Sequence, residues 1–162
     1  MDTERLLHQA ERDERDVMFP RFSAADAWEL GSLMVRRAQA QKIALAISID
    51  MNEQKLFYYA FDGTHLNNES AIARKSRVAH VFRCSSLRVF CELQSSGTAI
   101  EDRGRDPREY LALGGAVPIR IEGTGVIGTV CVSGLAHTED HHFTVNCMKE
   151  FLHDWKKGER PC

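Results

Sequence analysis

The densest group of side chains that could bind a metal ion or assist catalysis lies near the C-terminal end of the sequence. It consists of His137, Glu139, Asp140, His141 and His142. His137 and His141 are four positions apart, so both imidazoles could share one helix face and bind zinc. The zinc-protease pattern needs Glu directly after the first histidine, but Thr138 stands there. A metal would also need a third ligand, such as His65 or His80, so a capped, solvated helix start is the favoured interpretation.

A second group of side chains could bind an anion. Arg74, Lys75 and Arg77 lie near Asn67 and Asn68, close to the start of an expected helix. Guanidinium and ammonium groups in such a place bind carboxylates and phosphates through charge-assisted hydrogen bonds. A solvated helix face or a salt bridge between subunits would explain the same residues.

Two serines and two glycines are further candidates. Ser85 and Ser86 could contact a ligand through their hydroxyls, but helix capping is the favoured role and no general base is matched to either. Gly114 and Gly115 do not form a phosphate-binding loop, because the Gly-Lys-Ser/Thr ending is absent. They indicate instead a close backbone approach that lines a cleft or an interface.

The elements that position these residues follow from hydrophobic periodicity. Ser23 suits the cap of a helix that runs to about Gln41, and Gly31 on its apolar face indicates close contact with a sheet. Apolar residues alternate over 43–50 and predict a strand. Residues 55–61 predict its antiparallel hairpin partner.

Two helices are expected after the hairpin. The first starts near Asn67 or Asn68, and the second ends near Leu93. The residues 84–86 between them look like a break and a new helix cap. Residues 94–109 form the longest stretch without a structural pattern, and a loop of that length is usually functional or disordered.

Residues 110–141 complete the pattern with a Gly-Gly pair, two strands and a helix start at Thr138. The second strand, 125–132, is β-branched and apolar, as in a strand that is packed on both faces. Residues 2–16 predict a polar helix or a partly ordered arm, ended by Pro20. The order of two helices, two strands, two helices, two strands and a helix implies an antiparallel sheet covered by helices.

Length, charge and cysteine content limit the classes of protein to which this chain can belong. The chain has 162 residues, which suits a single domain, and its net charge of −2 gives no indication of nucleic-acid or membrane binding. The charged N-terminal residues predict neither a signal peptide nor a transit peptide. The five cysteines form no CxxC pair, which indicates reduced thiols in a cytosolic protein.

Four motifs in order carry a resemblance to a known family: L-N-N-E-S-A-I-A-R-K, C-S-S, E-Y-L-A-L-G-G-A-V-P-I and V-S-G-L-A-H-T-E-D-H. From about Trp28 to Leu152 the chain resembles the GlcG/HbpS-like superfamily, often labelled heme-degrading domain. Within it, the chain looks like the small cytosolic branch that includes a fungal protein linked to tail-anchored protein biogenesis. The resemblance implies an α+β, profilin-like α/β/α fold with a central antiparallel sheet of about five strands flanked by helices. We expect residues 1–20 to form an N-terminal helical arm and residues 21–158 a single domain.

The chain departs from the family at three positions. Cys84 and Leu113 stand where members of this branch typically carry histidine, and Ala71 replaces the usual tryptophan. A thiolate can hold heme iron, but Cys84 is favoured as a small structural residue, whose pKa Arg83 would lower if the two were close. Heme chemistry is therefore less expected here than in the family.

We accordingly expect a cytosolic homo-oligomer that binds a small anionic ligand or a protein partner in a cleft between subunits, without clear catalysis. The expected lining residues are Arg74, Lys75, Ser85, Ser86, Gly114, Gly115 and His141. The first alternative is a heme- or tetrapyrrole-binding protein that supports oxidative heme breakdown. Its candidate iron or metal ligands are His141, His137 and Cys84. The second is a chaperone-associated interaction module that uses the charged N-terminal arm and residues 97–109.

Overall fold

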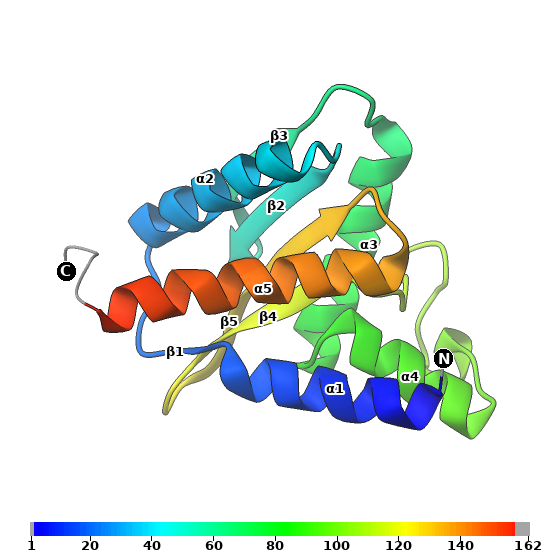
Figure 1. Cartoon of the computed structure of the whole chain (residues 1–162). Coiled ribbons are helices and arrows are strands. Elements are labelled where there is room, and N and C mark those ends of the chain that lie inside the picture. The colour runs from blue at the N-terminus through cyan, green and yellow to red at the C-terminus, as the bar shows by residue number, and fades with distance from the viewer. Residues whose placement is uncertain (1, 158–162) are drawn as a thin grey trace.

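The computed structural model describes residues 2–157 and arranges them in three layers, with a mixed five-stranded sheet between helices (Figure 1). In chain order the elements are α1 Thr3–Asp16, β1 Met18–Phe19, α2 Ala24–Gln41, β2 Ala46–Met51, β3 Gln54–Ala60, α3 Leu66–Phe82, α4 Ser86–Ser96, the 3-10 helix η1 Ile100–Arg103, β4 Ala116–Ile121, β5 Gly125–Ser133 and α5 His137–Lys156. The expected α+β fold class is confirmed. Cys162 and position 158, the last residue of the expected domain, lie outside the described residues.

The sheet has the strand order β1-β4-β5-β2-β3. The four longer strands pair antiparallel, as predicted, and β2 and β3 form the expected hairpin. The two-residue strand β1 pairs parallel with β4 and was not expected from the sequence. Two residues are too few to show an alternating pattern, and Phe19 is held there by complete burial in the core.

One face of the sheet carries the main apolar core, which α2 and α5 cover (Figure 1). Ser23 caps α2 in a reciprocal pair with Asp26, so the predicted start of this helix is confirmed. A Cβ on Gly31 would overlap the ring of Phe57 on β3, which shows the close helix–sheet contact that this glycine predicts. The loss of helix propensity at Gly31 is therefore offset by packing.

The other face of the sheet is covered by α3 (Figure 1). Small side chains, Ala46 and Cys131 from the sheet and Ala79 from the helix, form a compact core there. Along β2, Ser48 and Asp50 follow Ala46 at alternate positions and so lie on the same face. The face of β2 that α3 covers is therefore apolar at Ala46 and polar at Ser48 and Asp50, which lie nearer the hairpin turn.

Residues 3–16, for which the sequence left a helix or a partly ordered arm open, form the helix α1. It packs beside α4, with Leu6 and Ala10 against Leu87 and Cys91 (Figure 1). Among residues 2–157, no helix has the length and apolar character needed to span a membrane.

Candidate functional site

A buried ion pair joins α3 to the start of α5. Lys75 Nζ lies 3.0 Å from Asp140 Oδ2 and 3.4 Å from the carbonyl oxygen of Val132, and both charged side chains are almost fully buried. Burial raises the pKa of Asp140, and the charge of Lys75 opposes this rise. Gly115 has φ +137, and a Cβ there would lie 2.9 Å from Lys75 Nζ. The ammonium group of Lys75 thus has its ion-pair and hydrogen-bond partners within the protein.

The histidine-rich start of α5 is not the solvated helix start that was expected. The helix begins at His137, one residue earlier than predicted, and the side chain of Asp140 accepts a hydrogen bond from Leu135 N at 2.9 Å. Asp140 and His141 are buried, the first against Lys75 of α3 and the second against Asp13 of α1. His141 lies four residues before Val145, in the apolar stripe of the same helix, and this spacing is a signal of its burial.

His141 is the first of three donors to a buried carboxylate on α1. Its Nε2 lies 3.3 Å from Asp13 Oδ2, while Lys149 Nζ and Gln9 Nε2 donate to Oδ1 at 3.0 and 2.9 Å. Burial disfavours ionisation of Asp13, but the hydrogen bonds from His141, Lys149 and Gln9 outweigh it and lower its pKa to about 2. Asp13 therefore fastens α1 to α5.

His137 is held at the Gly-Gly pair. Gly114 N donates to His137 Nδ1 at 3.2 Å, and the imidazole packs edge-on against Phe90 with 4.7 Å between ring centroids. Burial and the nearby charge of Lys75 lower the pKa of His137. Both effects favour the neutral ring, in which Nδ1 can accept the hydrogen bond from Gly114 N.

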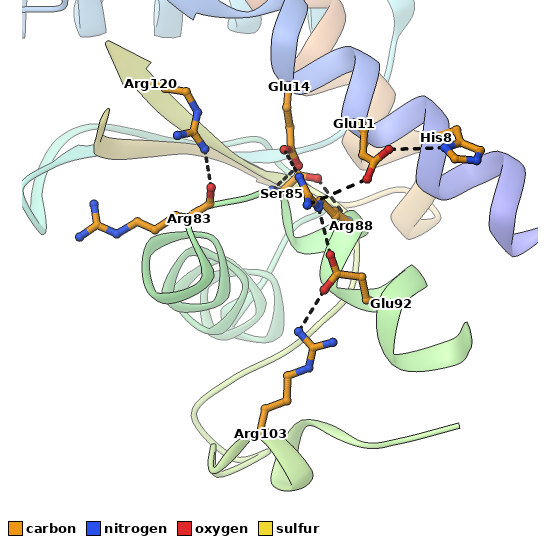
Figure 2. Close-up of polar contacts among 9 residues, drawn as sticks. All are labelled: His8, Glu11, Glu14, Arg83, Ser85, Arg88, Glu92, Arg103 and Arg120. Carbon is orange, nitrogen blue, oxygen red and sulfur yellow. Dashed lines mark hydrogen bonds and ion pairs between the residues drawn. The ribbon is translucent and has the colours of Figure 1, made fainter. Parts of the chain in front are cut away.

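The serine pair anchors α4. Ser85 caps the helix by accepting from Arg88 N at 3.2 Å, as favoured from the sequence, and its own N–H donates to Glu14 Oε1 at 2.7 Å. Figure 2 shows the guanidinium of Arg88 between the carboxylates of Glu14 and Glu11 on α1 and Glu92 on α4. A network of ion pairs thus joins α1 to α4 around the helix cap at Ser85.

Ser86 and Cys84 flank this cap and are both buried. Ser86 Oγ accepts from Ala116 N at 3.1 Å, which ties α4 to β4. Burial and the charge of Glu14 raise the pKa of Cys84 to about 12. Arg83 does not activate the thiol as was considered, because its guanidinium instead donates to the carbonyl of Val126 at 3.1 Å.

Seven of the predicted site residues thus gather around the start of β4, the middle of α3 and the first turns of α4 and α5. Six of these are Lys75, Ser85, Ser86, Gly114, Gly115 and His141, and the seventh is Arg74, whose carbonyl accepts from Leu111 N at 3.3 Å. The first six are buried, and their polar side-chain atoms contact the protein itself, except that His141 Nδ1 has no hydrogen-bond partner within residues 2–157. Arg74 is half-buried, and its Nε has no hydrogen-bond partner within residues 2–157.

A cavity of about 330 Å³ opens instead between α3, the β2–β3 hairpin and the loop before β4. Side chains that line it include Ser48, Asp50, Lys55, Arg77, His80 and Tyr110. Of the three basic residues singled out on α3, only Arg77 lines this cavity. Ile72, Lys75 and Ala79 share one face of α3, and this spacing is a sequence signal that Lys75 points into the core.

Asp50 and His80 face this cavity; Asp50 was missed as a functional candidate, and His80 was considered only as a third metal ligand. Asp50 Oδ2 accepts from Thr129 Oγ1 at 2.5 Å, and burial raises the pKa of Asp50 despite the nearby charges of His80 and Lys55. His80 Nε2 lies 3.6 Å from Glu53 Oε1, and its Nδ1 is buried without a hydrogen-bond partner within the described chain. The two residues are far apart in sequence and meet only because α3 packs over β2.

A second cavity of about 390 Å³ lies on the opposite face, between α2 and α5. Arg37 lines it and forms an ion pair with Glu150, so its charge is already compensated within the protein. The exposed His142 also lines this cavity. Residues 2–157 contain no cluster of three or more His, Cys, Asp or Glu side chains arranged to hold a metal ion.

Known proteins with similar sequences share nearly the whole chain. A UPF0303 protein of Streptomyces avermitilis is 40% identical over 147 residues, which cover 90% of each chain. A UPF0303 protein of Yersinia pseudotuberculosis is 35% identical over 153 residues, covering 94% of this chain and 90% of the relative.

Solved structures share the fold. The crystal structure of the Ybr137w protein has a TM-score of 0.84 at 27% identity and covers 91% of this chain and 88% of its own. HbpS has a TM-score of 0.65 at 16% identity, with coverage of 83% and 92%. A PduOC–heme complex has a TM-score of 0.67 at 18% identity, with coverage of 78% and 92%. The last two similarities show the fold alone.

Residues 22–149 match the family described as "Haem degrading protein HbpS-like". This range contains the sheet from β2 to β5 and the helices α2, α3 and α4, together with most of α5. The chain therefore belongs to the HbpS-like family of haem degrading proteins.

Proposed function

We propose that the protein is a cytosolic homo-oligomer that binds a small anionic molecule in the cavity between α3 and the hairpin, without catalysis of its own. The observation that carries the proposal is Arg77, which lines this cavity with a half-exposed guanidinium. Lys55, whose Nζ lies 4.7 Å above the ring of Tyr58, adds a second cation to the lining. Charge-assisted hydrogen bonds from such groups bind carboxylates and phosphates strongly.

The residues around Gly114 and Gly115 then support the cavity. The pair of Lys75 and Asp140 fixes α3 against α5, and the bond from Leu111 N to Arg74 O holds the loop that carries Tyr110. Arg74 does not line this cavity, so it stays a proposed ligand contact apart from it, because its Nε is buried without a partner among residues 2–157. We propose that the buried neighbours position the binding side chains and do not touch the ligand.

Isothermal titration with succinate and adipate tests the anion site. We expect saturable binding that Arg77→Gln weakens by about tenfold, since a hydrogen bond to a charged group contributes about 1.5–3 kcal/mol. Arg108→Gln is the matched control, because Arg108 is 88% exposed in its side chain and pairs only with Asp106 among the described residues. Equal binding by the wild type and Arg77→Gln would refute this site.

The proposed homo-oligomer has a suitable surface at β3. This strand is the last of the sheet, and large apolar side chains are exposed beside it on the strand and on α2. They are Trp28, Tyr58 and Tyr59. Exposed aromatic residues next to an unpaired strand edge favour pairing with another chain. Light scattering should give a multiple of 18.3 kDa, and a mass of 18.3 kDa in solution would overturn this proposal.

Heme binding is the second candidate function, because the family is described by heme degradation. The candidate ligands fit this role poorly. His141 is fully buried against Asp13, the imidazole of His137 accepts from Gly114 N, and Cys84 is buried with a pKa of about 12. Titration with hemin should therefore give no saturable Soret band. A sharp band that His141→Ala or Cys84→Ala abolishes would establish heme binding instead.

A further inference from the structure

The buried carboxylates of this protein differ in what compensates their charge. Asp13, Glu14 and Asp140 each have a lysine or arginine nitrogen within 3.3 Å. Asp50 is half-buried, and its oxygens receive hydrogen bonds only from Thr129 among the described residues. Within residues 2–157, no cation lies within ion-pair distance of Asp50.

The two basic side chains that act on Asp50 have partners of their own. Lys55 on β3 places its ammonium group over the ring of Tyr58, and His80 on α3 directs Nε2 toward Glu53. Burial of a carboxylate without a paired cation is unfavourable, and a cation supplied by a ligand would remove that penalty. The raised pKa of Asp50 agrees with an uncompensated carboxylate.

The opposite charge lies on another wall of the same cavity. Arg77 Nη1 donates to the carbonyl of Glu109 at 3.2 Å, and Glu109 Oε2 is 3.9 Å away. A guanidinium has five N–H donors, so most of those of Arg77 remain available. Arg77 is held by the loop before β4, whereas Asp50 is held by β5, so the two charges stand on separate walls.

His80 gives an independent indication that this cavity binds a ligand. Its Nδ1 is buried and has no hydrogen-bond partner within the described part of the chain. An unpartnered buried nitrogen is unfavourable unless a bound molecule or water supplies the partner. His80 lines the cavity together with Asp50 and Arg77.

We propose that this cavity binds a small zwitterion, with its ammonium group against Asp50 and its anionic group against Arg77. The inference rests on the proposed anion site and adds a cationic end to the ligand. It therefore requires a zwitterion to bind more tightly than a dianion of the same length.

Two length-matched pairs of probes test the inference by isothermal titration: γ-aminobutyrate with succinate, and ε-aminocaproate with adipate. At least one zwitterion should bind about tenfold more tightly than its dianion, as expected for one charge-assisted contact. Asp50→Asn should abolish this preference and leave dianion binding unchanged or stronger, because Asn keeps the acceptor for Thr129 and removes only the charge. Asp62→Asn, at an exposed position after β3, is the control and should retain the preference.

The outcomes separate the inference from the proposed function. Dianions that bind through Arg77 as tightly as the zwitterions would overturn the zwitterion proposal and leave the anion site intact. No binding by any probe would overturn both. If Asp50→Asn does not fold, Asp50→Ser replaces it, because Ser also removes the charge and keeps a hydroxyl oxygen that can accept a hydrogen bond. A preference for the zwitterion that survives Asp50→Ser undiminished would then overturn the proposal.

Discussion

Two polar regions adjoin α3, one at the start of β4 and one in the cavity beside the β2–β3 hairpin. At the start of β4, Lys75 and Asp140 form a buried, fully compensated pair. In the cavity beside the hairpin, Asp50 accepts a hydrogen bond from Thr129 but has no cation within ion-pair distance among the described residues, and His80 Nδ1 has no hydrogen-bond partner there. Compensated buried groups fix a structure, whereas uncompensated groups beside a cavity are available to a ligand. The comparison shows that some polar and charged residues of this protein stabilise the fold, whereas others are available to bind a ligand.

The largest effect should come from breaking the compensated pair. Lys75→Met keeps most of the side-chain volume but leaves Asp140 buried without a cation, so we expect a loss of about 3–5 kcal/mol in the free energy of unfolding. Urea denaturation measures it. Adding Asp140→Asn should recover part of the loss, and a Lys75→Met protein as stable as the wild type would show that the pair is not structural.

The next effect concerns Asp13, whose folded pKa of about 2 lies below its ordinary value of 3.8. Its ionisation therefore stabilises the fold above about pH 4, and this contribution is lost as the pH falls toward about 2. Asp13→Asn should remove about 2 kcal/mol at pH 7 and flatten the pH dependence of stability in that window. Denaturation at several pH values measures both. An unchanged pH dependence would contradict the role of Asp13.

A smaller effect is expected at the cap of α4. Ser85→Ala removes the acceptor for Arg88 N and should lower the stability by about 1 kcal/mol. Ser96→Ala at the other end of the same helix is the control and should change the stability by less than about 0.5 kcal/mol. Equal losses in the two variants would show that the cap does not matter. Thermal and urea denaturation both resolve a difference of this size.

The smallest effect on stability should come from the cavity. The folded pKa of Asp50 is raised, so its ionisation opposes folding as the pH rises past its ordinary value. Asp50→Asn should therefore change the stability at pH 7 by less than about 0.5 kcal/mol or increase it slightly, even though the preference for a zwitterion is lost. A loss as large as that of Asp13→Asn would place Asp50 with the structural carboxylates and remove the contrast between the regions.

Local features of the fold were predictable from the sequence. The cap at Ser23, the hairpin and the new helix cap at Ser85 depend on neighbouring residues, and the structure confirms all three. The family motifs correctly indicated the fold class. The close contact of Gly31 with the sheet was also foreseeable, because glycine weakens a helix and suits an apolar face where a neighbour leaves no room for a Cβ.

The candidate site was less predictable, for physical reasons. Asp50 and His80 lie on different elements, and only the packing of α3 across β2 brings them to one cavity. The burial of Lys75 and His141 could have been inferred from helical spacing, since both lie in apolar stripes. Their partners Asp140 and Asp13 could not, because long-range ion pairs have no fixed separation in sequence.

The attachment of α1 has a consequence for the order of folding during synthesis. Two of the three partners of Asp13 lie far along the chain, His141 at a separation of 128 positions and Lys149 at 136. Helix α1 leaves the ribosome before α5, so its buried carboxylate gains these two partners only after α5 has been made. Closing such long loops is entropically unfavourable and slow. The attachment of α1 is therefore completed late: its apolar face can pack against α4 as soon as that helix has been made, but the carboxylate of Asp13 stays without its partners on α5 until the end of the described chain has been made.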